Sequence, residues 1–85
     1  MGVIYKTTNI VNGKYYVGQH HTDIDDGYLG SGKLILLAIK KYGRHNFVRE
    51  ILEYCSDDII HERETYWIHH FNSIVNGYNL TIGGK

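Results

Sequence analysis

The segment GVIYKTTNIVNGKYYVGQH, residues 2–20, carries the clearest structural pattern in the chain. Residues 2–8 and 14–19 are rich in β-branched and aromatic side chains, which favour strands. They flank Asn12 and Gly13, a dipeptide typical of two-residue hairpin turns. The segment therefore predicts two antiparallel strands joined by a tight turn.

The predicted turn decides which side chains face one another across the hairpin. A two-residue turn at positions 12 and 13 places Tyr5 opposite His20, and Tyr16 then projects from the same face of the hairpin. Gly18 leaves room between Tyr16 and His20. We expect these three side chains to form a polar aromatic patch, unless a bulge at the turn breaks the pairing. The alternative is that each tyrosine is an ordinary core residue with a solvated hydroxyl.

The rest of the chain predicts two helices and one more strand. Apolar residues at i, i+3, i+4 and i+7 predict a helix over residues 31–42 that stops at Gly43. Positions 34, 36 and 37 are leucine as well, so this helix should be largely buried. Residues 47–54 suit a third strand. Ser56 can cap a helix that carries Asp57 and Asp58 in its first turn and runs to about residue 71.

These elements define the expected fold class and domain organisation. The class is α+β, with a small three-stranded antiparallel sheet flanked by helices. Neither a linker nor an internal repeat interrupts the sequence. Residues 1–85 are therefore expected to form a single domain.

Composition narrows the classes of function. The chain has 85 residues, one cysteine and a formal net charge of +0, with nine Lys plus Arg against nine Asp plus Glu. One cysteine excludes a disulfide framework, and a neutral chain has no bulk attraction to nucleic acid, so DNA would be held weakly by this chain alone. No apolar run approaches the roughly 20 residues of a membrane span, and no basic secretory signal precedes the first strand. We expect no membrane association and a cytoplasmic location.

The stretch GYLGSGKL, residues 27–34, has the G-x-x-x-x-G-K spacing of a nucleotide-binding loop. That motif requires Ser or Thr after the lysine and an apolar strand before the loop, whereas Leu34 follows Lys33 and residues 20–26 are polar. A nucleotide-binding loop is therefore excluded. What remains is that Ser31, its flanking glycines and Lys33 can hold a phosphate at a helix start. The alternative is a glycine-rich loop with a solvated lysine.

The predicted second long helix places a carboxylate within its apolar stripe. At about 100° per residue, Glu64 shares one arc with the residues that should face the sheet, namely Ile60, Trp67, Ile68 and Phe71. Glu62 lies on the opposite, solvated face. Burial of a carboxylate is costly without a partner, so Glu64 is a candidate ligand for a metal ion or a basic group. The alternative is an internal ion pair with Arg63 or Arg49.

Four motifs, in order, resemble the GIY-YIG nuclease family, especially the catalytic domains of phage and intron homing endonucleases. They are Gly2-Val3-Ile4-Tyr5, Tyr16-Val17-Gly18, the helix that bears Glu64, and Asn76-Gly77-Tyr78-Asn79. The resemblance implies one divalent ion, Mg²⁺ or Mn²⁺, and attack of a water on a DNA phosphodiester. It assigns Glu64 as the metal ligand, places Tyr5 and Tyr16 along the scissile phosphate to position or deprotonate the water, and gives Asn79 a supporting role. Gly18, Ser31 and Asn79 are the expected substrate-binding residues.

The chain departs from the family pattern in one respect. Family members usually carry an arginine on a helix shortly after Tyr-x-Gly, and no arginine occurs here between Gly18 and Arg44. Another group must then offset the charge of the transition state. The nearest catalytic candidates are Lys33, which follows the glycine turn, and His20, which lies on the tyrosine face of the hairpin. Arg44 and Arg49 remain alternatives.

The resulting prediction is a metal-dependent DNA endonuclease domain of homing or phage type, acting in a phage or bacterial host cell. Its expected partner is DNA, together with a C-terminal DNA-binding region of the kind that follows this domain in homing relatives. Six histidines lack any standard zinc spacing, so structural zinc is not expected. The runner-up is a catalytically inactive domain of the same fold that binds DNA or a protein partner.

Overall fold

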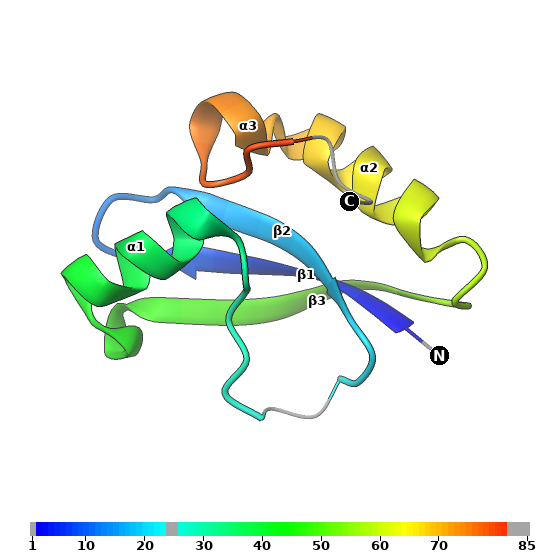
Figure 1. The fold of residues 1–85 in the computed structure, drawn as a ribbon, viewed down its shortest axis with the longest axis horizontal. Helices are drawn as coiled ribbons and strands as arrows, with labels where there is room; N and C mark the ends of the chain where they lie inside the picture. The colour runs from blue at the N-terminus through cyan, green and yellow to red at the C-terminus, as the bar shows by residue number, and fades with distance from the viewer. Residues whose placement is uncertain (1, 24–25, 82–85) are drawn as a thin grey trace.

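The computed structural model describes residues 2–23 and 26–81. Its sheet has three antiparallel strands in the order β2-β1-β3, formed by β1 (Gly2–Asn9), β2 (Tyr15–His20) and β3 (Phe47–Cys55) (Figure 1). The predicted α+β class, with a small antiparallel sheet flanked by helices, is confirmed. Because β1 is central, β2 and β3 are the edges of the sheet.

The predicted register of the hairpin is wrong by two residues. Tyr5 lies opposite Gly18, and His20 lies opposite Val3. The loop is longer than two residues because the side chain of Asn9 accepts a hydrogen bond from the backbone N–H of Val11 at 3.0 Å, while the Asn9 N–H bonds the Lys14 carbonyl at 2.8 Å. Since side chains alternate with a period of two, a slip of two residues leaves Tyr5, Tyr16 and His20 on one face.

Helix α1 (Lys33–Tyr42) ends at Gly43, as predicted, and a short 3₁₀ turn (Arg44–Asn46) leads into β3. Gly43 has a φ of 90°, which glycine adopts readily, and its N–H caps the Ile39 carbonyl. The prediction that this helix is largely buried is wrong, because Leu36 and Leu37 are 51% and 55% exposed. Only one side of α1 packs on the sheet, so its other leucines remain in solvent.

The second long helix, α2 (Ile60–Phe71), begins later than predicted. Ser56 does not cap it; its hydroxyl donates to the Asp58 carboxylate, and a turn joins the Ile59 N–H to the Ser56 carbonyl at 3.2 Å. The helix ends at Asn72, whose φ of 51° is left-handed, and a last short helix follows, α3 (Ser73–Asn76). None of the helices among the described residues is both long and apolar enough to cross a membrane.

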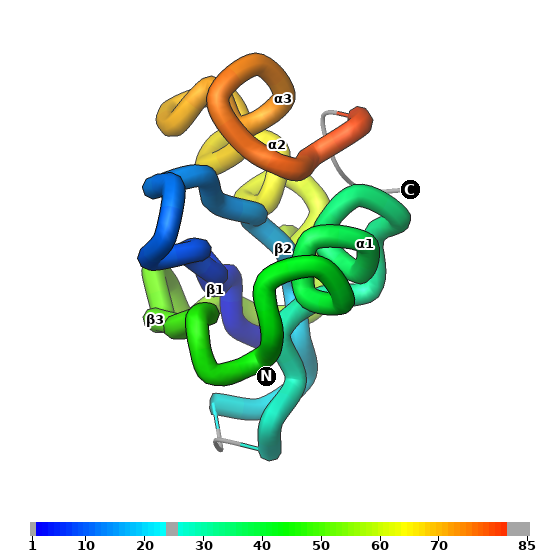
Figure 2. The backbone as a smooth tube through the Cα atoms, turned by 90° about the vertical axis from the view of Figure 1, so that its left-hand side faces the viewer, coloured from blue at the N-terminus to red at the C-terminus, as the bar shows by residue number. Residues whose placement is uncertain are grey.

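Alternate residues of the strands pack into two separate cores, one on each face of the sheet. Seen from the β1–β2 turn, α1 lies on one side of β1 and β2, and α2 with α3 lies on the other (Figure 2). The α2 core contains Ile4, Val17, Ile60 and Ile68, with Leu52, Cys55, Trp67 and Phe71 against it. The α1 core contains Ile35, Ala38 and Phe47, with Tyr16, Leu29, Ile39, Tyr42 and Tyr78 against it. The edge strand β2 therefore carries side chains that reach toward both helices.

Candidate active site

A cleft of ≈ 390 Å³ lies along the edge strand β2. It collects side chains from both faces of the sheet and from the segment that follows α3. Its lining is Tyr16, Gln19, Ser31, Gly32, Lys33, Glu64, Tyr78, Asn79, Leu80 and Thr81. Five of the predicted site residues therefore line one cleft. They are the predicted metal ligand Glu64 and four other polar residues, Tyr16, Ser31, Lys33 and Asn79.

Glu64 forms the α2 wall of this cleft. It is 7% exposed and sits on the buried side of the helix, whereas Glu62 is exposed, as the helical periodicity predicted. The side-chain amide of Gln19 donates a hydrogen bond of 2.7 Å to its Oε1. The two arginines considered as its ion-pair partners form ion pairs with other residues. Arg63 lies 2.9 Å from the Glu53 carboxylate, and Arg49 lies 3.6 Å from the Asp26 carboxylate.

Tyr16 forms the opposite wall and is held by glycines. A Cβ on Gly30 or on Gly32 would come within 2.9 Å of its ring, so the Gly30-Ser31-Gly32 turn fits closely around the phenol. Burial raises the pKa of Tyr16, and the negative charge of Glu64 raises it further, against hydrogen bonds from the Gly32 backbone and the Ser31 side chain that lower it. Tyr16 is therefore a neutral hydroxyl at neutral pH, and the glycine turn of GYLGSGKL is part of its support.

Tyr5 lies behind this wall and does not line the cleft. It is 1% exposed, and its ring centroid is 6.3 Å from that of Tyr16 and 5.8 Å from that of Tyr28. Burial raises its pKa far above the ordinary value for tyrosine, with smaller contributions from Tyr28 and Tyr16. Gly18 is not a lining residue either; its missing side chain makes the space that the Tyr5 hydroxyl and the Tyr16 ring occupy.

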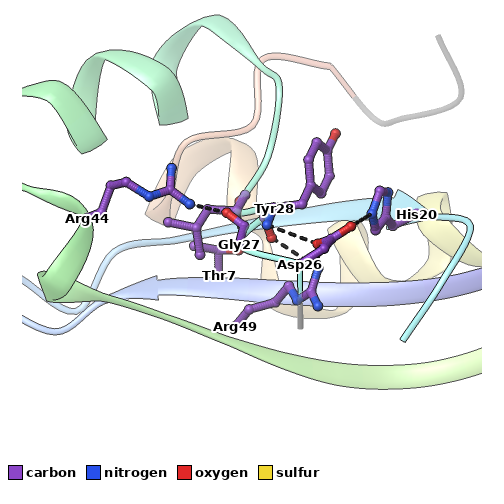
Figure 3. A network of polar contacts seen from close by, with 8 residues as sticks. Thr7, His20, Asp26, Gly27, Tyr28, Arg44 and Arg49 are labelled. Atoms are coloured by element: carbon purple, nitrogen blue, oxygen red, sulfur yellow. Dashed lines mark hydrogen bonds and ion pairs between the residues drawn. The ribbon is translucent and has the colours of Figure 1, made fainter. Parts of the chain in front are cut away.

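His20 and the two candidate arginines, Arg44 and Arg49, contact the loop around Asp26 (Figure 3). The His20 ring stacks on Tyr28 with centroids 4.1 Å apart and bonds Asp26 at 3.0 Å. Arg49 donates to the Tyr28 carbonyl at 3.0 Å, and Arg44 donates to the Gly27 carbonyl. None of the three lines the cleft, so Lys33 is the predicted cationic candidate that the fold places there.

Asn79 braces the edge strand. Its side-chain Oδ1 accepts from the Val17 N–H and its Nδ2 donates to the Val17 carbonyl, each at 2.9 Å, and the Tyr78 N–H bonds the Tyr15 carbonyl at 2.8 Å. Both polar atoms of the amide are thereby engaged with β2. The side chain thus supports β2, and because Asn79 also lines the cleft, its contact with substrate stays a prediction.

Sequence reasoning missed Gln19 and Tyr28. Gln19 follows Gly18 on β2, and the period of two places it on the α2 face with Val17, opposite Glu64. The alternation of side chains along β2 could be read from the sequence. It indicates a contact with Glu64 only when the packing of α2 against β2 is already known. Tyr28 belongs to the connection between β2 and α1. This segment has no helical or strand periodicity, so the sequence does not predict where its side chains point.

The structure thus combines a small α+β scaffold with an edge-strand cleft that is lined by a buried carboxylate, a phenol and a lysine. Residues 1–79 match the family described as the GIY-YIG catalytic domain, and the chain belongs to this family.

Similar proteins come from a phage. The chain is 46% identical over 87 residues to endonuclease segA and 36% identical over 91 residues to intron-associated endonuclease 1, both from Enterobacteria phage T4. These alignments cover 95% and 91% of this chain but 38% and 36% of the two relatives, so the chain spans well under half of their lengths.

Solved structures give the same result for the fold. A mutant of the catalytic domain of intron endonuclease I-TevI superposes with a TM-score of 0.78 at 31% identity, covering 99% of this chain and 98% of that one. The catalytic domain of homing endonuclease I-TevI gives a TM-score of 0.74 at 32% identity, covering 95% and 99% of the two chains. The fold and the family resemblance predicted from the sequence are both confirmed.

Proposed function

We propose that this chain is a divalent-metal-dependent endonuclease domain that hydrolyses DNA phosphodiester bonds, with Glu64 as the ligand of one Mg²⁺ or Mn²⁺ ion. The observation that carries the proposal is the lining of one cleft by the Glu64 carboxylate, the Tyr16 hydroxyl and the Lys33 ammonium group. The endonuclease names of the T4 relatives agree with this activity.

The residues of the cleft fit a hard divalent cation. Glu64 is a nearly buried carboxylate that opens into a cleft, and oxygen donors of this kind are those that Mg²⁺ and Mn²⁺ prefer. Within residues 2–23 and 26–81 no three His, Cys, Asp or Glu side chains gather into a site by themselves. Water or phosphate oxygens would therefore complete the coordination. A bound divalent ion supplies charge neutralisation at the phosphate and activates the attacking water.

Tyr16 acts as a hydrogen-bond donor in this scheme. Its raised pKa keeps it protonated at neutral pH in the metal-free protein, so its hydroxyl can donate a hydrogen bond that positions the water or a phosphate oxygen. The glycine turn at Gly30 and Gly32 packs closely against its ring and limits the positions that the ring can take. Tyr5 supports Tyr16 from behind.

Lys33 stabilises the negative charge that develops on the phosphate. It is the first residue of α1 and stands beside Gly32 at the mouth of the cleft, so its charge adds to the positive end of the helix. It takes the place of the arginine that the family usually carries after Tyr-x-Gly. The lining residues among the described part of the chain include no arginine, which leaves this task to Lys33.

The DNA substrate is held by more than this cleft. With a net charge of +0 the chain has little general attraction to phosphate backbones. The T4 relatives extend well beyond the aligned region, and we propose that a C-terminal DNA-binding region supplies affinity and sequence choice. The expected setting is the cytoplasm of a phage-infected bacterial cell.

Plasmid nicking tests the proposal. Supercoiled plasmid incubated with the chain should be converted to nicked and linear forms in Mg²⁺ or Mn²⁺, and should stay intact in EDTA. Retarded migration of the plasmid without cleavage in either ion would instead support an inactive DNA-binding domain, the alternative that the missing arginine suggests.

A further inference from the structure

The amide nitrogen of Gln19 sits between two side chains of α2. Its Nε2 is 2.7 Å from Glu64 Oε1 and 2.8 Å from His61 Nδ1. His61 and Glu64 are three residues apart, so they lie on adjacent turns of one helix face. The three side chains form a closed cluster at the α2 end of the cleft.

The contacts of Gln19 show which way the His61 lone pair points. An amide nitrogen carries two hydrogens and has no acceptor lone pair, so both neighbours act as acceptors. Nδ1 of His61 therefore presents its lone pair to the point that Glu64 Oε1 also faces. A neutral imidazole nitrogen and a carboxylate oxygen that converge on one point are the donors that divalent transition-metal ions bind.

We infer that His61 is a second protein ligand at the metal site, joining Glu64 when the Gln19 amide swings away, and that the site consequently favours Mn²⁺, Co²⁺ or Ni²⁺ over Mg²⁺. This inference rests on the proposed function, because it takes Glu64 as the first ligand. Metal–ligand distances of about 2.0–2.2 Å are shorter than the present contacts to Nε2, so the two side chains close in slightly on the ion.

The surroundings of the cluster allow this change. His61 is exposed and lines a second hollow of ≈ 440 Å³ together with His20, His21, Asp57 and Ile60. Gln19 lines both this hollow and the cleft, so it forms the wall between them. When its side chain rotates, Nε2 leaves the point that both His61 Nδ1 and Glu64 Oε1 face.

Metal binding measured without DNA tests the inference. Mn²⁺ added to the whole chain should show the nitrogen coupling of a bound imidazole in pulsed electron paramagnetic resonance. His61→Ala should abolish this coupling and lower Co²⁺ affinity, measured by calorimetry, about tenfold or more, while Mg²⁺ affinity changes less than about twofold. His69→Ala is the matched control, because His69 is an exposed histidine of the same helix, and it should behave as the unmodified chain.

The outcomes separate this inference from the proposed function. Bound Mn²⁺ that depends on Glu64 but lacks imidazole coupling would overturn the role of His61 and leave Glu64 as the metal ligand. No Mn²⁺ binding up to millimolar concentration would also overturn the two-ligand site, while the plasmid assay could still succeed with an ion that binds together with DNA. Equal Mn²⁺ binding by the chain and by Glu64→Gln would count against the proposed metal ligand itself.

Discussion

The two faces of the sheet are built from different chemistry. The α2 face is a core of Ile4, Val17, Ile60 and Ile68, with Glu64 as the one buried charged residue among those described. The α1 face buries polar groups, and each is satisfied by a distant segment: Thr7 donates to the Leu29 carbonyl at 2.7 Å, and Asn9 donates to the Tyr78 hydroxyl at 3.1 Å. The α1 face therefore combines apolar packing against α1 with polar bonds to loop segments, whereas the α2 face is packed mainly by apolar residues of α2 and the strands. The cleft lies where they meet.

The largest expected effect comes from the single carboxylate of the α2 face. Glu64→Gln keeps the shape of the side chain but removes its charge, so plasmid cleavage should fall by about 10³-fold or more if a metal ion is held there. The Glu62→Gln variant, which alters the solvated side of the same helix, should cleave at the normal rate. Equal losses in the two variants would show that position on the helix does not matter.

Lys33 tests the α1 side of the cleft. Lys33→Ala should lower turnover by about 10²-fold, the range expected when one preorganised charge-stabilising donor is lost, and Lys33→Arg should restore part of it. Lys40→Ala, two turns along the same helix, should change turnover little. A normal rate for Lys33→Ala together with an inactive His20→Ala would transfer this role to the histidine that bonds Asp26.

The two tyrosines of the α1 face should respond differently. Tyr16→Phe removes a hydroxyl that lines the cleft, so kcat should fall roughly tenfold, as expected for one hydrogen bond to a charged group. Tyr5→Phe removes a buried hydroxyl behind the cleft, so it should cost about 1 kcal/mol of stability with a rate change under about twofold. Steady-state kinetics and urea unfolding would measure both; a larger rate loss for Tyr5→Phe would contradict the assigned positions.

Gly18 tests how closely the α1 face is packed. A Cβ there would lie 2.6 Å from Tyr5 Cζ and 2.9 Å from Tyr16 Cε2, so Gly18→Ala should lower the free energy of unfolding by about 1–3 kcal/mol. Gly13→Asn is the control. Position 13 has a φ of 77° and open space around it, and asparagine tolerates this conformation, so the loss should stay below about 1 kcal/mol.

The smallest effect is expected from the second carboxylate near α2, Glu53. A hydrogen bond of 2.8 Å from Trp67 is the main reason that its pKa lies below the ordinary 4.5, and Arg63 lowers it further. A carboxyl group with a lowered folded-state pKa contributes stability above its unfolded pKa and loses it as the pH falls through the folded value. Glu53→Gln should therefore flatten the decline of stability below about pH 4.5 and leave its slope at pH 7 unchanged.

Sequence reasoning succeeded where a short-range period governs the structure. The strands, the stop of α1 at Gly43 and the burial of Glu64 follow from alternation, a glycine cap and a helical stripe, each contained within a few residues. It failed where a side chain competes locally with the expected pattern. The Asn9 side chain lengthened the hairpin loop, and Ser56 bonded Asp58 in place of capping α2.

The residues around the phenols could not be predicted for a different reason. Tyr28 meets Tyr5 and His20 through a connection without periodicity, and Gln19 meets His61 and Glu64 across 42 and 45 residues of chain. The exposure of Leu36 and Leu37 depends on how many neighbours α1 has, which composition does not encode. Such contacts depend on how distant segments pack together, and the local sequence does not predict them.

The pairing of Asn79 with Val17, across 62 residues of chain, has a consequence for synthesis of the protein. During translation β2 leaves the ribosome early, and the groups that cover its outer edge, Tyr78 and Asn79, leave it much later. Until then the nascent chain carries an uncovered edge strand, which is a template for pairing with other chains. The cleft along β2 also lacks the wall formed by Tyr78 and Asn79 for this time, so its lining is complete only after this segment has been made.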